Sequence, residues 1–225
     1  MKKLILYMML ISPCSLMAQI GIKAGLNFAN VTNASDINSG SQTGFHGGIF
    51  LAPPSKGILS SRTEFLFSRQ GYDYSTNTNT GNVNLDYIML PQFMAFNITK
   101  FLQLQVGFQM AYLVSAKADS TSSSGEYGAY GDIMDFYNRF DYGLGGGIEV
   151  HPISGLLVGA RFNVSFGDLY STDPEDYANG TPPSFVPKVD VKNNVFQLFV
   201  GWRFGKQPES KKKQEKKENK ENKEP

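Results

Sequence analysis

The feature that most constrains the fold is a set of eight segments in which apolar and polar residues alternate. The clearest starts at Leu102, where Leu, Val, Phe, Met and Tyr at every second position alternate mainly with Gln and Gly up to Ser115. Side chains on a strand point alternately to opposite faces, so this period predicts strands with one apolar face. The other predicted strands are Gln19–Ala29, about Thr43–Ala52, Ile58–Tyr74, Val83–Asn97, Phe140–His151, Leu156–Tyr170 and Asn194–Phe204. The facing of Val83–Asn97 is left open, because both of its parities are apolar and it contains Pro91.

The connections between these segments alternate in length. Those at 53–57, 97–100 and 152–155 are short and rich in turn residues, whereas those at 30–42, 75–82, 118–139 and 171–192 are longer and polar. Alternation of this kind places all tight turns at one end of an up-and-down barrel. The first and last strands then pair antiparallel to close it.

The apolar parity could face lipid or the core of a soluble, lipocalin-like barrel. No run approaches the roughly eighteen apolar residues of a transmembrane helix. The polar parity is dense in glycine, and eight strands enclose an interior only just wide enough for side chains, so the small residues belong inside. We therefore expect an all-β, eight-stranded antiparallel up-and-down transmembrane β-barrel with a filled lumen.

The two ends of the chain differ from the barrel. Residues 1–18 combine Lys2 and Lys3, an apolar stretch and a small residue, Ala18, which is typical of a cleaved signal peptide. Cleavage there removes Cys14, so the mature chain has no thiol or disulfide chemistry. Residues 19–205 form the predicted barrel, and 206–225 are a Lys/Glu-rich tail with no apolar residue to bury, expected to be disordered in the periplasm. The predicted location is the outer membrane, with both termini periplasmic.

Two groups of residues are candidate sites. Charged residues on the inward parity must be paired or hydrated, and we expect a network that fills the lumen rather than a solute path. Aromatic residues near strand ends match the girdles of transmembrane barrels, a reading that also covers Tyr72, Tyr74, Tyr87 and Tyr170. The lumenal charges are Lys23, Arg62, Glu64, Glu149, Arg161 and Arg203, and the main interface aromatics are Tyr112, Tyr142, Trp202 and Phe204.

The sequence contains few residues that could serve in catalysis or in metal binding. A barrel enzyme needs a histidine base at the outer rim, but His151 precedes Pro152 at a tight turn and His46 lies within a predicted strand. The loop carboxylates lack the spacing of a known calcium motif, so no metal, cofactor or catalytic residue is predicted. The expected partners are outer-membrane lipid, the barrel-insertion machinery acting on the last strand, and an extracellular protein or glycan at the loops; no nucleic acid is expected.

Four stretches link the chain to a known family: Gly21–Phe28, Thr63–Gly71, Asp86–Pro91 and the glycine-rich Tyr142–Ile148. With them the chain resembles the PorT-like, or "porin family", outer-membrane β-barrels of Gram-negative bacteria over nearly all of residues 19–205. The resemblance implies an eight-stranded barrel in the outer membrane, and one named member is linked to protein secretion. The tail after Phe204 departs from the family, whose barrels commonly end at the terminal aromatic.

The function predicted from these observations is that of a non-enzymatic integral outer-membrane protein. Its role would be structural, surface-binding or accessory to envelope secretion. A porin for small solutes or ions is the first alternative, and a lipid-modifying barrel enzyme is the second.

Overall fold

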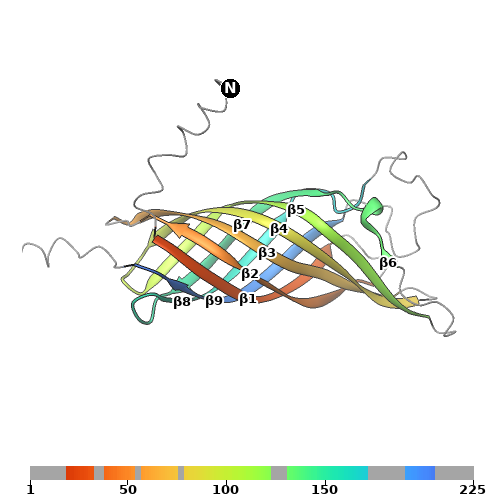
Figure 1. Cartoon of the computed structure of the whole chain (residues 1–225), viewed down its shortest axis with the longest axis horizontal. Coiled ribbons are helices and arrows are strands. Elements are labelled where there is room, and N and C mark those ends of the chain that lie inside the picture. The colour runs from red at the N-terminus through yellow and green to blue at the C-terminus, as the bar shows by residue number, and fades with distance from the viewer. Residues whose placement is uncertain are drawn as a thin grey trace, which may run out of the picture.

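The computed structural model describes residues 19–32, 38–53, 57–75, 79–122, 131–171 and 191–205. Eight long antiparallel strands form one closed sheet (Figure 1). They are β1 Gln19–Thr32, β2 Gly40–Ala52, β3 Leu59–Ser75, β4 Asn79–Asn97, β5 Leu102–Ser122, β7 Phe140–Val150, β8 Leu156–Ser165 and β9 Lys192–Arg203. A two-residue strand, β6 Gly131–Asp132, pairs with β5 and precedes a 3-10 turn at Met134–Phe136. The predicted fold class is confirmed.

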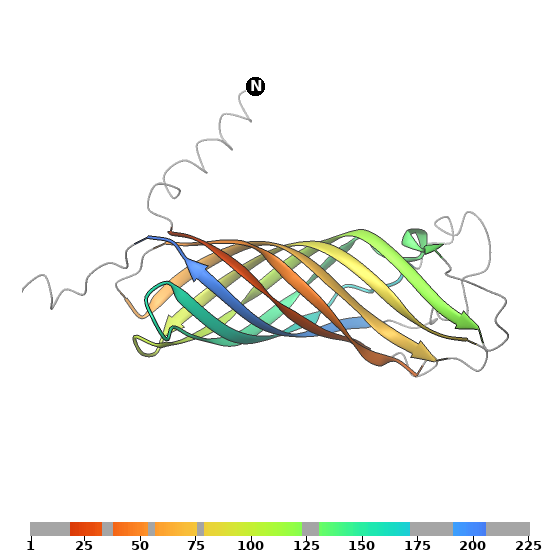
Figure 2. The same ribbon diagram turned by 60° about the horizontal axis from the view of Figure 1, so that its bottom comes forward.

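The ring closes in two places. β4 pairs with β5 along its whole length, and β1 pairs with β9 from Gly21↔Arg203 to Thr32↔Lys192, as predicted for the first and last strands. The start of β1, the end of β9 and the tight turns all lie at the same end of the barrel. This end is on the left in both ribbon views (Figure 2). β3, β4 and β5 have 17, 19 and 21 residues, against about 9–11 for a tilted strand that spans a membrane, so they extend beyond it at the other end.

The outer surface of the barrel is apolar. Alternate residues of every long strand point outward, and many of the large apolar ones keep 40–55 % of their surface exposed, for example Ile22 in β1, Phe108 in β5 and Val200 in β9. In water such a surface would be unfavourable, but hydrocarbon accommodates it, and the inward parity holds the buried residues. No helix among the described residues is long and apolar enough to cross a membrane.

Several strand boundaries differ from the sequence-based prediction. β5 continues to Ser122 and β4 begins at Asn79, so the loops predicted at 118–139 and 75–82 are partly strand. β8 ends at Ser165 rather than near Tyr170. In β4 the even-numbered residues face outward, and Pro91 is buried with the inward parity. Both faces of β4 are apolar because its inner residues Leu85, Met89 and Phe93 form part of the interior packing.

The predicted signal peptide, 1–18, and tail, 206–225, lie outside the described residues. The expectations stated for them therefore remain predictions.

Candidate functional site

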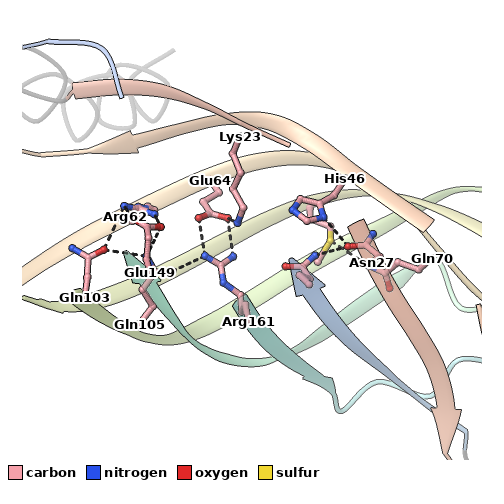
Figure 3. Close-up of polar contacts among 12 residues, drawn as sticks. Lys23, Asn27, His46, Arg62, Glu64, Gln70, Gln103, Gln105, Glu149 and Arg161 are labelled. Carbon is pink, nitrogen blue, oxygen red and sulfur yellow. Dashed lines mark hydrogen bonds and ion pairs between the residues drawn. The ribbon is translucent and has the colours of Figure 1, made fainter. Parts of the chain in front are cut away.

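A charged layer crosses the lumen in the half of the barrel near the tight turns (Figure 3). Glu64 of β3 accepts hydrogen bonds from Lys23 of β1 at 3.0 Å and from both terminal nitrogens of Arg161 of β8 at 2.8 and 2.9 Å. Arg62, two residues from Glu64, forms a second bidentate pair with Glu149 of β7, with Nη2 2.8 Å from Oε1. These side chains come from four strands and meet on the barrel axis because each lies on the inward parity.

Two glutamines connect the ion pairs. Gln105 of β5 accepts a hydrogen bond from Arg161 Nη2 at 2.7 Å and donates one to Glu149 Oε2 at 3.0 Å. Gln103 accepts from Gln105 at 3.1 Å and donates to Asn97 at 2.7 Å. The sequence-based prediction omitted both residues, although their place on the inward parity of the most regular strand was available as a signal.

Aromatic rings enclose the cations. The guanidinium carbon of Arg161 lies 3.8 Å from the centre of the Phe93 ring, and Nζ of Lys23 lies 3.8 Å from that of Phe199. The Phe50 ring covers Arg62 at 4.8 Å. The five charged residues are at most 3 % exposed. Such contacts replace part of the lost hydration, and together with the bidentate pairs they make burial of these charges tolerable.

Arg203 is the one predicted lumenal charge that does not join this network. Its side chain is partly buried, and its Nε has no hydrogen-bond partner among the described residues. Among the described residues Arg203 forms no ion pair with Glu64 or Glu149. Glu149 instead accepts, besides Arg62, a hydrogen bond from His151 Nε2 at 3.0 Å, a contact that the sequence did not indicate.

A neutral polar layer lies next to the charged one in the lumen, to its right in Figure 3. Asn27 donates to Ser68 at 2.9 Å, and its Oδ1 accepts from Gln197 at 3.0 Å. His46 Nδ1 lies 2.7 Å from the same Oδ1, so His46 donates from Nδ1 and its Nε2 is an acceptor without a partner among the described residues. His46 is enclosed within the barrel, 2 % exposed; Ser68, its register partner in β3, accepts its hydrogen bond from Asn27, so Asn27 links the two side chains.

An aromatic and aliphatic cluster fills the lumen at the end opposite the tight turns. The hydroxyls of Tyr72, Tyr137 and Tyr170 meet there, with Tyr72 and Tyr137 2.7 Å apart and Tyr72 in contact with Tyr170. Burial raises the pKa of Tyr170 to about 12 and that of Tyr137 well above its usual value, so both hydroxyls stay neutral at physiological pH. Around them pack Val31, Leu66, Tyr74, Val83, Leu85, Tyr87, Met89, Leu113, Ile133, Leu169 and Val191.

This cluster corrects the assignment of four aromatics to the membrane interface. Tyr72, Tyr74, Tyr87 and Tyr170 are 0–4 % exposed and point into the lumen. In contrast, Tyr112, Tyr142, Trp202 and Phe204 lie on the outer surface with 41–50 % of their area exposed. Tyr72 and Tyr74 of β3 and Tyr87 of β4 lie on the inward parity of strand ends that extend beyond the membrane, and Tyr170, which follows β8 and bridges to Tyr137, completes the same interior core.

Metal-binding groups are not assembled in the described part of the chain, where no three His, Cys, Asp or Glu residues come together. The polar groups of the lumen are paired charges, amides and phenols that bond to one another, as in a packed interior.

Comparison with solved structures identifies similar barrels. Neisserial surface protein A (NspA) is 14 % identical, with a TM-score of 0.51 over 82 % of this chain and 97 % of that one. Ail, the attachment invasion locus protein of Yersinia pestis, is 16 % identical, with a TM-score of 0.46 over 84 % of this chain and 100 % of that one. The likeness to NspA supports the fold alone.

A family model gives the assignment. No curated protein sequence matches the chain. The model described as "Outer membrane protein beta-barrel domain" matches residues 12–171, more than half of the sequence, and indicates the outer membrane as its location. The closed antiparallel ring, the apolar outer surface and this match agree, and the chain belongs to the outer membrane protein beta-barrel domain family.

Proposed function

We propose that the barrel is a closed, non-enzymatic anchor that holds its long connections and strand ends at the cell surface. The observation that carries this proposal is the lumen, which is blocked twice. The ion pairs of Glu64 and Glu149 cross it near the tight turns, and the cluster around Tyr72 fills it at the other end. A solute would have to displace both layers.

The orientation of the anchor follows the general rule for transmembrane barrels. Short turns face the periplasm and long connections face outward. On that rule both termini lie in the periplasm, and the extended parts of β3, β4 and β5 project from the cell. These strand ends and the connections between them would bind an extracellular protein or glycan, and Phe204, exposed at the end of the last strand, would be read by the insertion machinery.

An accessory part in envelope protein secretion is a finer role within this proposal, and its support is the PorT-like sequence resemblance, one named member of that family being linked to secretion. In that role the closed lumen serves as a rigid support for contacts at either rim. Deleting the gene tests it: secreted proteins should accumulate in the periplasm, and undiminished secretion would argue against it.

The closed lumen predicts that the purified protein does not conduct. Refolded protein in planar bilayers should give no ion-sized current steps at any voltage that leaves the membrane intact. Reproducible steps from pure protein, lost on heat denaturation, would instead favour the porin. A known open porin measured in the same bilayers controls for insertion and sensitivity.

The enzyme alternative has its own test. Mass spectra of envelope lipids should be the same in cells carrying the wild-type chain, the His46→Ala variant or no copy. A lipid modification that depends on His46 would overturn the non-enzymatic assignment.

A further inference from the structure

The lipid-facing surface is interrupted by polar side chains at one place. Each long strand has interior outward positions, which lie between two outward apolar residues of the same strand. Among the described strands these interior positions are apolar or glycine, except Ser61 and Thr63 in β3 and Gln92 in β4. We call these three residues the polar track.

The track is continuous across two neighbouring strands. Thr63 pairs with Gln92 in the β3–β4 register, and Gln92 Nε2 donates to Thr63 Oγ1 at 2.5 Å. Apolar side chains border it above and below: Phe65 and Leu90 on one side, Leu59 and Met94 on the other, each 44–52 % exposed. The track thus lies within the zone that faces hydrocarbon, not at its edge.

The polar groups of the track are incompletely satisfied. Gln92 Oε1 is a buried acceptor without a donor among the described residues. The Ser61 hydroxyl is exposed and makes no hydrogen bond to the described residues, so it is the group of the track that meets hydrocarbon unsatisfied. Pro91, next to Gln92, has no N–H to give to the ladder, so the wall has one hydrogen bond fewer at this level. Hydrocarbon offers no hydrogen bonds, and an unsatisfied polar group in it is costly.

We propose that the polar track is the contact between two copies of this chain in the membrane. Hydroxyl and carboxamide groups each donate and accept, so the track is complementary to itself across a two-fold axis. It carries no charge and offers none to a charged partner. Interhelical hydrogen bonds between serine, threonine and glutamine side chains hold membrane helices together, and the same chemistry applies between barrels.

The symmetry fixes where the copies touch. Both barrels insert in one direction, so the axis runs along the membrane normal and residues at the same depth face one another, with those on the axis meeting their own counterparts. Phe65, Leu90, Met94 and Phe108, which surround the track, would pack against the partner in place of lipid.

Single cysteines test the contact directly, because the only cysteine of the chain, Cys14, lies in the segment expected to be removed. Ser61→Cys and Met94→Cys should give a disulfide-linked dimer in oxidised outer membranes. Val200→Cys, equally lipid-facing at 50 % exposure but on β9 across the ring, is the matched control and should give at least tenfold less. Equal yields, or an adduct whose mass is not twice that of the chain, would overturn the proposal.

A second measurement separates polar recognition from simple apolar packing. Thr63→Val with Gln92→Leu, placed in the Ser61→Cys background, should lower the dimer yield several-fold while the barrel keeps its heat-modifiable migration. An unchanged yield in a folded barrel would contradict the role of the track. Native mass spectrometry of the wild-type chain from mild detergent provides an independent reading, with a dimer expected and a monomer alone counting against it.

Discussion

Replacing Glu64 by alanine is expected to destabilise the barrel by about 3–5 kcal/mol, enough to abolish folding in weak detergents. Glu64 is the common partner of Lys23 and Arg161, and all three side chains are at most 1 % exposed. The variant leaves the buried cations Lys23 and Arg161 without the carboxylate that both of them contact. Each retains the desolvation cost that the pair had offset.

The loss can be measured by urea titration in lipid vesicles. Trp202 is the only tryptophan and lies on the outer surface, so its fluorescence reports the transfer from lipid to water. The matched control is Arg69→Ala, which breaks the outward-facing pair with Asp86, where Arg69 is 42 % exposed; its cost should be about 1 kcal/mol or less. A loss for Glu64→Ala no larger than that of Arg69→Ala would contradict the network's structural role.

A variant without any charge in this group tests whether Glu64→Ala loses stability through unpaired buried charges or through lost packing. Lys23→Met, Glu64→Leu and Arg161→Met together remove every charge of one ion-pair group and retain most of its volume. Buried ion pairs replaced in this way are often neutral or stabilising, so the triple variant should recover most of the stability lost in Glu64→Ala. Failure to recover would mean that geometry, not charge balance, is what Glu64 supplies.

Much of the fold was predictable because lipid enforces a simple rule. Most outward residues of the membrane-crossing segments are apolar, and this period predicted the number of strands, their closure and the inward placement of Lys23, Glu64 and Arg161. Alternation specifies the face of a residue but not its height in the lumen. Height depends on the stagger between strands, and for that reason neither the pairing of Glu149 with Arg62 and His151 nor the absence of Arg203 from the network was predictable.

The rule fails where the barrel leaves the membrane. Tyr72 and Tyr74 share the parity of Arg62 and Glu64, so their inward direction was present in the sequence, but the expectation of a girdle at strand ends overrode it. Tyr87 carried no such signal, because β4 is apolar on both faces. A bulge between Asp86 and Tyr87 also shifts the register of β4 on β5 there, which no alternation predicts.

Gly48→Ala is expected to destabilise the barrel by about 3 kcal/mol, whereas its neighbour Gly47→Ala should be neutral or stabilising. A Cβ at Gly48 would lie 2.1 Å from the backbone oxygen of Phe65 and 2.9 Å from Leu66 Cα. Neither can move without displacing β3, which holds Arg62 and Glu64 in the charged layer. At Gly47, on the lipid-facing side, the nearest atom is 3.7 Å away, so a methyl group fits and also reduces the freedom of the unfolded chain.

The two substitutions are identical in chemistry and adjacent in β2, so composition, propensity and insertion depth cancel between them. Only the face differs. Urea titration followed through Trp202 should therefore separate the variants by several kcal/mol, with the loss confined to Gly48→Ala. Similar stabilities would mean that β2 and β3 can part by the width of a methyl group. The close approach that lets eight strands enclose the charged layer would then not depend on glycine, and the inward bias of glycine in this sequence would need another cause.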